Sequence, residues 1–173
     1  MRKQKGFSLI ELLIVVAIIL IIAAIAIPNL IRSKIAANNS AAAATVRTLN
    51  TGEATYNSLY PGAGYATLAG LGPGASTCGT ASSTNACIID FTLGCAAGTT
   101  GGTCTRDNFK YSITLPAGNQ DYIIGALPLG PNTGSQDYCS APDMVVRTAS
   151  DATAAGTFPT TDAACQGGNY LPI

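Results

Sequence analysis

Glu11 is an acidic residue inside an otherwise apolar run of the chain. Three cations, Arg2, Lys3 and Lys5, precede this run, which covers residues 7–27. As a helix, its 21 residues would span roughly 32 Å, which matches the hydrocarbon core of a bilayer. A charge near the middle of a membrane helix costs about 2.5–3.5 kcal/mol, so Glu11 is a candidate functional residue.

The chemistry open to Glu11 is ion pairing with an amine. The nearest cation on its own chain, Lys5, lies six residues earlier and near a different helical face. Cleavage between Gly6 and Phe7 would create a new α-amino group at the start of the apolar helix. A second copy of the chain, displaced lengthwise by about one helical turn, could place its amine against this carboxylate. Because a mismatched buried charge is costly, such pairing would favour one register between copies.

These residues resemble the N-terminus of a type IV prepilin or a type II secretion pseudopilin. The shared features are a short basic leader ending in Gly6, then Phe7, Glu11 four residues later, and Pro28 late in a long apolar helix. The resemblance is close over about the first 30 residues and loose over about the first 60. It implies cleavage after Gly6 by a prepilin peptidase, N-methylation of Phe7, and subunit assembly through Phe7 and Glu11. Pro28 lacks an amide N–H and should kink or loosen the helix.

A secretory signal peptide is the alternative interpretation of this segment. It also begins with cations and an apolar run, and residues 24–26 resemble a small-residue cleavage site. However, the run is longer than the 7–15 residues typical of such peptides, and it contains Glu11. N-terminal sequencing of the exported protein distinguishes the two: a start at Phe7 supports a prepilin, and a start at Ile27 contradicts it.

The composition limits the remaining functions. The formal net charge is zero, and loss of the three leader cations leaves six cations against nine acids, a net charge of −3. Such a mildly acidic surface argues against general nucleic-acid binding. The chain has no histidine, which excludes histidine-based acid–base catalysis, metal sites and haem ligation.

The domain organisation follows from the helical pattern. We expect a leader at 1–6, a transmembrane or filament-core helix at 7–28, an amphipathic helix at 29–60, and a globular head at 61–173. Apolar residues at helical spacing form one stripe of the second helix: Ile31, Ile35, Ala42, Val46, Leu49, Tyr56 and Tyr60. The break is expected at Tyr60-Pro61-Gly62. The predicted fold is α+β, with the amphipathic helix packed on a small antiparallel sheet.

Alternating apolar and polar residues predict the sheet. Residues 109–115 alternate without a break, a turn follows at 116–120, and residues 121–127 form a second strand, so 109–127 is predicted to be an antiparallel hairpin. Two further strands are expected near 88–93 and 144–148.

The six cysteines all follow the apolar segment, which with an export signal indicates an oxidising compartment and up to three disulfides. Six cysteines allow 15 pairings, and the sequence does not choose among them. Neighbouring pairs, Cys78–Cys87 and Cys95–Cys104, would close two small loops. Cys139 and Cys165 could join the last strand to the C-terminal tail, which resembles the late disulfide of pilin heads.

No catalytic motif, cofactor motif or metal-ligand spacing is present. There is no P-loop or dinucleotide fingerprint. Asp137, Asp143, Asp151 and Asp162 are spread through the C-terminal part of the chain without EF-hand spacing, and we expect neither a metal nor a cofactor. The interpretation is therefore a structural protein and not an enzyme.

The resemblance implies a pilin, and a head of more than 100 residues with six cysteines and no charged cluster favours a major pilin. Its precursor would lie in the bacterial inner membrane and would be processed by the peptidase. The assembly machinery would then add it to a helical homopolymer on the cell surface. A type II secretion pseudopilin or minor pilin is the alternative within the superfamily. A membrane-tethered or secreted adhesive module is the alternative from another class.

Overall fold

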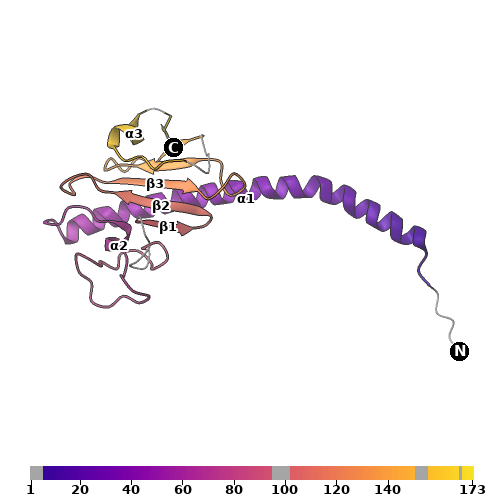
Figure 1. Cartoon of the computed structure of the whole chain (residues 1–173), viewed down its shortest axis with the longest axis horizontal. Coiled ribbons are helices and arrows are strands. Elements are labelled where there is room, and N and C mark those ends of the chain that lie inside the picture. Colours follow the sequence, from indigo (N-terminus) through magenta and orange to yellow (C-terminus); the bar gives the residue numbers. More distant parts are fainter. Residues whose placement is uncertain (1–5, 95–101, 151–155, 168) are drawn as a thin grey trace. The chain divides into compact units, whose positions relative to one another are not determined.

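The computed structural model describes residues 6–94, 102–150, 156–167 and 169–173. The chain forms two compact units, Met1–Lys34 and Ile35–Ile173. The predicted α+β class is confirmed, since a long N-terminal helix is followed by an antiparallel sheet (Figure 1).

Helix α1 runs from Leu9 to Leu59, a length of 51 residues. The alanine run at 41–44 has the highest helix propensity available. The helix ends directly before Tyr60 and Pro61, because the chain turns at Pro61-Gly62. Pro28 lies inside α1, and the residues on both sides of it are helical.

The second half of α1 packs on the sheet through the expected stripe. Ala42, Val46 and Leu49 are fully buried, and Tyr56 is 3% exposed. These side chains share one hydrophobic core with the inward-facing residues of the sheet. The cations of this half, such as Arg47, lie on the exposed face.

The sheet has six strands in the order of the sequence, each antiparallel to its neighbours. The strands are β1 (Thr103–Arg106), β2 (Phe109–Thr114), β3 (Ile123–Pro128), β4 (Asp137–Ser140), β5 (Arg147–Ala149) and β6 (Leu171–Pro172). The expected hairpin is present as β2 and β3, which pair from Phe109–Pro128 to Thr114–Ile123.

The expectation of a strand at 88–93 was wrong. The backbone there forms a bend and a turn, and the N–H groups of Ile88 and Ile89 both donate to the carbonyl of Leu71. The carboxylate of Asp90 accepts from the N–H of Leu93 and closes the turn. The apolar run therefore reflects burial of Ile89 and Leu93 in the core without strand pairing.

The strand expected at 144–148 was also misplaced. Met144 has φ +58°, and its N–H donates to the carbonyl of Ala141 in a turn. The strand begins only at Arg147, where pairing with β4 starts. Strands β1, β4 and β6 were missed, because runs of two to four residues carry too little alternation to be recognised.

Different elements pack on the two faces of the sheet. Phe109, Tyr111 and Ile113 of β2 face the core shared with α1. On the other face, a Cβ added at Gly125 of β3 would lie 2.5 Å from the ring of Phe158. The C-terminal segment, with the short helix α3 (Asp162–Gln166), thus packs against the face opposite α1.

Gly64 permits a close backbone contact beside the end of α1. It has φ +78°, and a Cβ there would lie 2.0 Å from the carbonyl oxygen of Asn119, which accepts from the N–H of Tyr65 at 2.8 Å. We expect Gly64→Ala to lower the free energy of unfolding by about 2 kcal/mol or more, from strain plus displaced backbone.

Gly62→Ala is the matched control, because no atom lies within 4 Å of a Cβ built at Gly62. Urea unfolding followed by circular dichroism measures both variants. Equal stabilities of the two variants would contradict the role assigned to Gly64.

Candidate functional site

The candidate processing site lies directly before α1. Residues 6–8 are not helical, no atom lies within 4 Å of a Cβ built at Gly6, and Phe7 is 79% exposed. The Gly6–Phe7 peptide bond thus lies outside the helix, and the residues on both sides of it are exposed. The leader residues 1–5 lie outside the described residues.

Glu11 caps the first turn of α1. Its Oε2 accepts a hydrogen bond from the backbone N–H of Ser8 at 2.9 Å. Ser8 precedes the first helical residue, so Ser8 and Glu11 occupy the two ends of a capping box, in which the acid satisfies an N–H that the helix leaves free. The S-x-x-E spacing was visible in the sequence, but only the charge of Glu11 was considered there.

This hydrogen bond is compatible with the expected ion pair between Glu11 and an amine of another copy. One carboxylate oxygen is engaged by a neutral backbone donor, and the charge meets no cation among the ion pairs of the described residues. The helix N-terminus itself favours a nearby negative charge. Glu11 is therefore held in a defined place, with capacity to accept from a further donor such as an amine of another copy.

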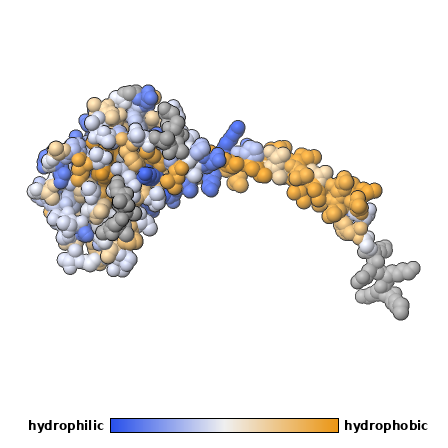
Figure 2. All heavy atoms as spheres, viewed as in Figure 1, coloured by the Kyte–Doolittle hydropathy of each residue, from blue (hydrophilic) through white to orange (hydrophobic). Residues whose placement is uncertain are grey.

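The first unit presents a continuous apolar surface. Every large apolar side chain between Phe7 and Ile31 is at least 42% exposed, and apolar colouring predominates along this part of α1 in Figure 2. The helix is long and apolar enough to cross a membrane. An exposed apolar surface of this size requires lipid or protein to cover it.

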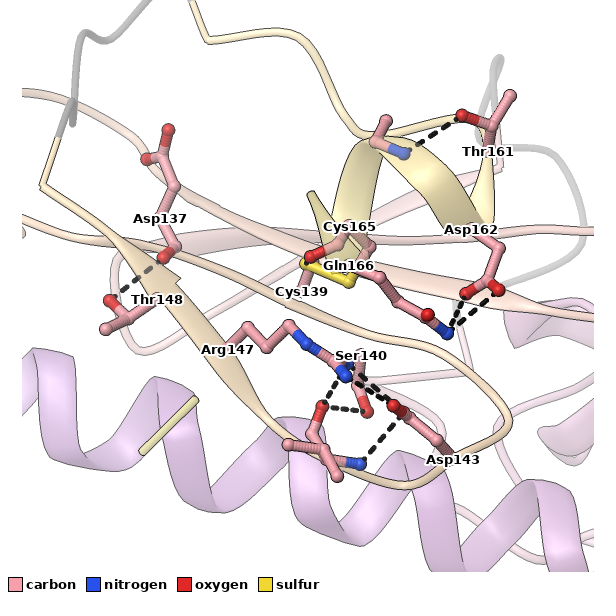
Figure 3. Close-up of a disulfide and its surroundings, with 12 residues drawn as sticks. Asp137, Cys139, Ser140, Asp143, Arg147, Thr148, Thr161, Asp162, Cys165 and Gln166 are labelled. Atoms are coloured by element: carbon pink, nitrogen blue, oxygen red, sulfur yellow. Dashed lines mark hydrogen bonds and ion pairs between the residues drawn. A yellow bond between two sulfur atoms is a disulfide. The ribbon is translucent and has the colours of Figure 1, made fainter. Parts of the chain in front are cut away.

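The C-terminal disulfide is buried between the sheet and α3. Cys139 and Cys165 are both fully buried and bonded to each other, and they pack with Ile123 and Tyr170 in a second small apolar cluster. Figure 3 shows that the bond joins β4 to α3. The expected pairing of these two cysteines is present.

The other expected pairings concern the irregular region. Cys78 and Cys87 are bonded, and they close a loop with a sequence separation of nine. Cys104 is disulfide-bonded. Its expected partner, Cys95, lies outside the described residues.

The turn between β4 and β5 is fixed by an ion pair. Both terminal guanidinium nitrogens of Arg147 donate to the carboxylate of Asp143, which also accepts from the N–H of Val145 (Figure 3). The bonded guanidinium lowers the pKa of Asp143 below its ordinary value. In the parts of the chain that the structure describes, no three acidic or cysteine side chains gather as a metal site.

Two buried polar residues of α1 were not recognised from the sequence. Asn50 donates to Ser140 Oγ at 2.8 Å and accepts from the hydroxyl of Tyr122 at 3.2 Å, which ties α1 to β4 and to the start of β3. Glu53 is fully buried. The available signal was position, because Glu53 follows Leu49 by four residues and Val46 by seven and so lies on the buried stripe.

Comparisons with known proteins concern the N-terminal part of the chain. The family described as "Prokaryotic N-terminal methylation motif" matches residues 1–27. The type IV wide pilus major component PilA4 of Thermus thermophilus is 60% identical over 40 residues, 23% of this chain and 30% of that protein. The type IV major pilin protein PilA of Myxococcus xanthus is 46% identical over 54 residues, 31% of this chain and 24% of that protein. No solved structure matches the chain.

The matches thus cover less than a third of either relative. Both relatives are named as pilus components, which are structural subunits and not enzymes. The methylation motif covers Gly6, Phe7 and Glu11, the residues on which the sequence interpretation depends. Through this motif and these two matches, the N-terminal part of the chain is similar to that of type IV pilins.

Proposed function

We propose that the chain is a structural subunit of a type IV pilus, and specifically a major pilin. The observation that carries the proposal is the apolar surface of α1 between Phe7 and Ile31, which no part of the described chain covers. In the precursor, lipid of the inner membrane would cover this surface. In the fibre, the same segments of other copies would cover it.

Processing would create an α-amino group with which Glu11 could pair. Cleavage between Gly6 and Phe7 by a prepilin peptidase removes three cations and leaves one amine at Phe7, which would then be methylated. In the fibre, the amine of one copy would pair with Glu11 of another, where the carboxylate already accepts from Ser8. A contact that repeats from copy to copy without closing produces an open helical fibre.

The relatives favour a major subunit, since both are named as major components of pili. The head is also braced by disulfides, as suits a fibre exposed to the exterior. An assembly machine would extract subunits from the inner membrane, and the mature protein would lie on the cell surface.

Electron microscopy of material sheared from cells, with mass spectrometry of its main component, tests the proposal. We expect fibres composed mainly of this chain, with Phe7 as a methylated N-terminus. A chain confined to the cell envelope would indicate a pseudopilin, and trace amounts in fibres of another subunit would indicate a minor pilin. A secreted monomer beginning at Ile27 would contradict membership of any fibre.

A further inference from the structure

Glu53 is an acid in the centre of the head core. It lies on the buried face of α1 and is 0% exposed. Ala66, in the segment 60–67 that follows α1, lies at hydrogen-bond distance from it. The chain contains only one other glutamate, Glu11.

The carboxyl of Glu53 has one partner. Its Oε2 accepts from the backbone N–H of Ala66 at 3.0 Å, and its Oε1 is buried with no hydrogen-bond partner among the described residues. None of the ion pairs within the described ranges includes Glu53. A buried carboxylate with one neutral donor and no cation is poorly compensated, whereas a protonated carboxyl loses much less on burial.

The titratable groups facing Glu53 are tyrosines, and none of them supplies compensation. Tyr56, on α1, donates its hydroxyl to the carbonyl of Ser83. Tyr122, directly before β3, donates a hydrogen bond from its hydroxyl to Asn50. The ring of Tyr65, in segment 60–67, packs edge-on against the ring of Tyr122, with 4.6 Å between the ring centroids. Burial, with the charge of Glu53 as a lesser cause, raises the pKa of Tyr56 and of Tyr122, so both stay neutral at neutral pH.

We propose that Glu53 is a proton-dependent latch, which holds segment 60–67 against α1 while its carboxyl is protonated and releases the segment when the carboxyl ionises. Apolar packing of Tyr60, Ala63, Tyr65 and Ala66 on the core also holds the segment, together with a small number of hydrogen bonds. The N–H of Tyr65 donates to Asn119, and Asn57 donates to the carbonyl of Gly64 at 3.4 Å. Release would expose the end of α1 and leave the antiparallel sheet paired.

The direction of the pH effect follows from the environment. Burial raises the pKa of Glu53 from 4.5 to about 8, and the Ala66 bond opposes this only partly. A group whose pKa is raised by folding binds more protons in the closed state, so closure loses stability as pH rises. The latch is therefore at full strength below pH 4.5, weakens as pH rises toward 8, and is lost above about 8.

Direct titration is the first test. The full chain in detergent micelles, labelled with carbon-13 at the glutamate side-chain carboxyls, should give two signals, and Glu11→Gln assigns them by removing one. We expect the Glu53 signal to titrate with a midpoint near pH 8. A midpoint below pH 6 would overturn the proposal, and this measurement needs no variant at Glu53.

Amide exchange tests the release itself. With the pKa at 4.5 when exposed and about 8 when buried, opening should become roughly fiftyfold more favourable between pH 6 and pH 8. We expect the protection factor of the Ala66 N–H to fall by this factor, while amides of β2 and β3 keep theirs.

Glu53→Gln is the matched variant, because its amide oxygen can still accept from Ala66 but cannot ionise. Its Ala66 protection should change less than threefold over the same pH range. The same pH dependence in Glu53→Gln and in the unaltered chain would show that another group controls the segment. An unchanged protection factor in the unaltered chain would show that ionisation does not release it.

Discussion

Cells that carry Glu11→Ala are expected to lack surface fibres of this protein. The substitution acts on both states of the subunit. Removal of a charge from the first turn of the proposed membrane segment makes the inserted state more favourable, by at most the roughly 2.5–3.5 kcal/mol that a charge costs at the centre of a membrane helix. In the proposed fibre it removes the acid that pairs with the amine of Phe7. Electron microscopy of sheared material measures fibres, and immunoblotting of membranes checks that the processed subunit accumulates there.

Glu11→Gln separates charge from helix capping. An amide oxygen at this position can still accept from the N–H of Ser8, so the start of α1 is preserved. The neutral amide carries no charge, however, and cannot form an ion pair with an amine. We expect this variant to lack fibres as Glu11→Ala does. Normal fibres from Glu11→Gln would show that Glu11 acts by capping alone, and normal fibres from both variants would remove the pairing from the proposed function.

Replacement of both Cys139 and Cys165 by Ala is expected to cause a large loss of head stability. The bond spans a sequence separation of 26, for which loop-closure entropy predicts about 3.5 kcal/mol. Both sulfurs are also buried against Ile123 and Tyr170, so their removal leaves a small cavity. Since a domain of this size is stable by about 5–15 kcal/mol, the melting temperature of the full chain in detergent should fall by roughly 10 °C.

The double replacement Cys78→Ala with Cys87→Ala is the matched control. That bond spans a separation of nine, which predicts only about 2.7 kcal/mol, and Cys78 lies on the surface. Thermal unfolding followed by circular dichroism compares the two double variants. A loss from Cys78/Cys87 equal to or larger than that from Cys139/Cys165 would contradict the assignment of the buried bond as the main brace.

The features predicted correctly are those encoded by nearby residues. Helical spacing of Val46, Leu49 and Tyr56 predicted the buried face of α1, and uninterrupted alternation from Phe109 predicted the hairpin. Both patterns are local, so one segment of sequence contains the whole signal. The S-x-x-E spacing of the capping box at Ser8 and Glu11 was equally local. It was not predicted, because Glu11 was interpreted only as a charge inside an apolar helix.

The features predicted wrongly depend on distant partners. Residues 88–93 are apolar enough for a strand, but Leu71 accepts their N–H groups and the core receives their side chains. The four residues of β4 become a strand because β3 and β5 pair with them on either side. The sequence of a short segment does not show which strands it will pair with.

The sequence alone determined that this protein has a basic N-terminal segment, an apolar helix with one acid, and an α+β fold, because charge, periodicity and spacing along the chain carry that information. The tertiary structure alone decided that Cys139 bonds to Cys165, that Glu53 is buried with one donor, and that Gly64 meets Asn119. Each of these depends on segments that only the folded chain brings together. The helix α3 packs on the face of the sheet opposite α1 and brings Cys165 to Cys139, and the segment after α1 folds back to place Ala66 at Glu53 and Gly64 at Asn119.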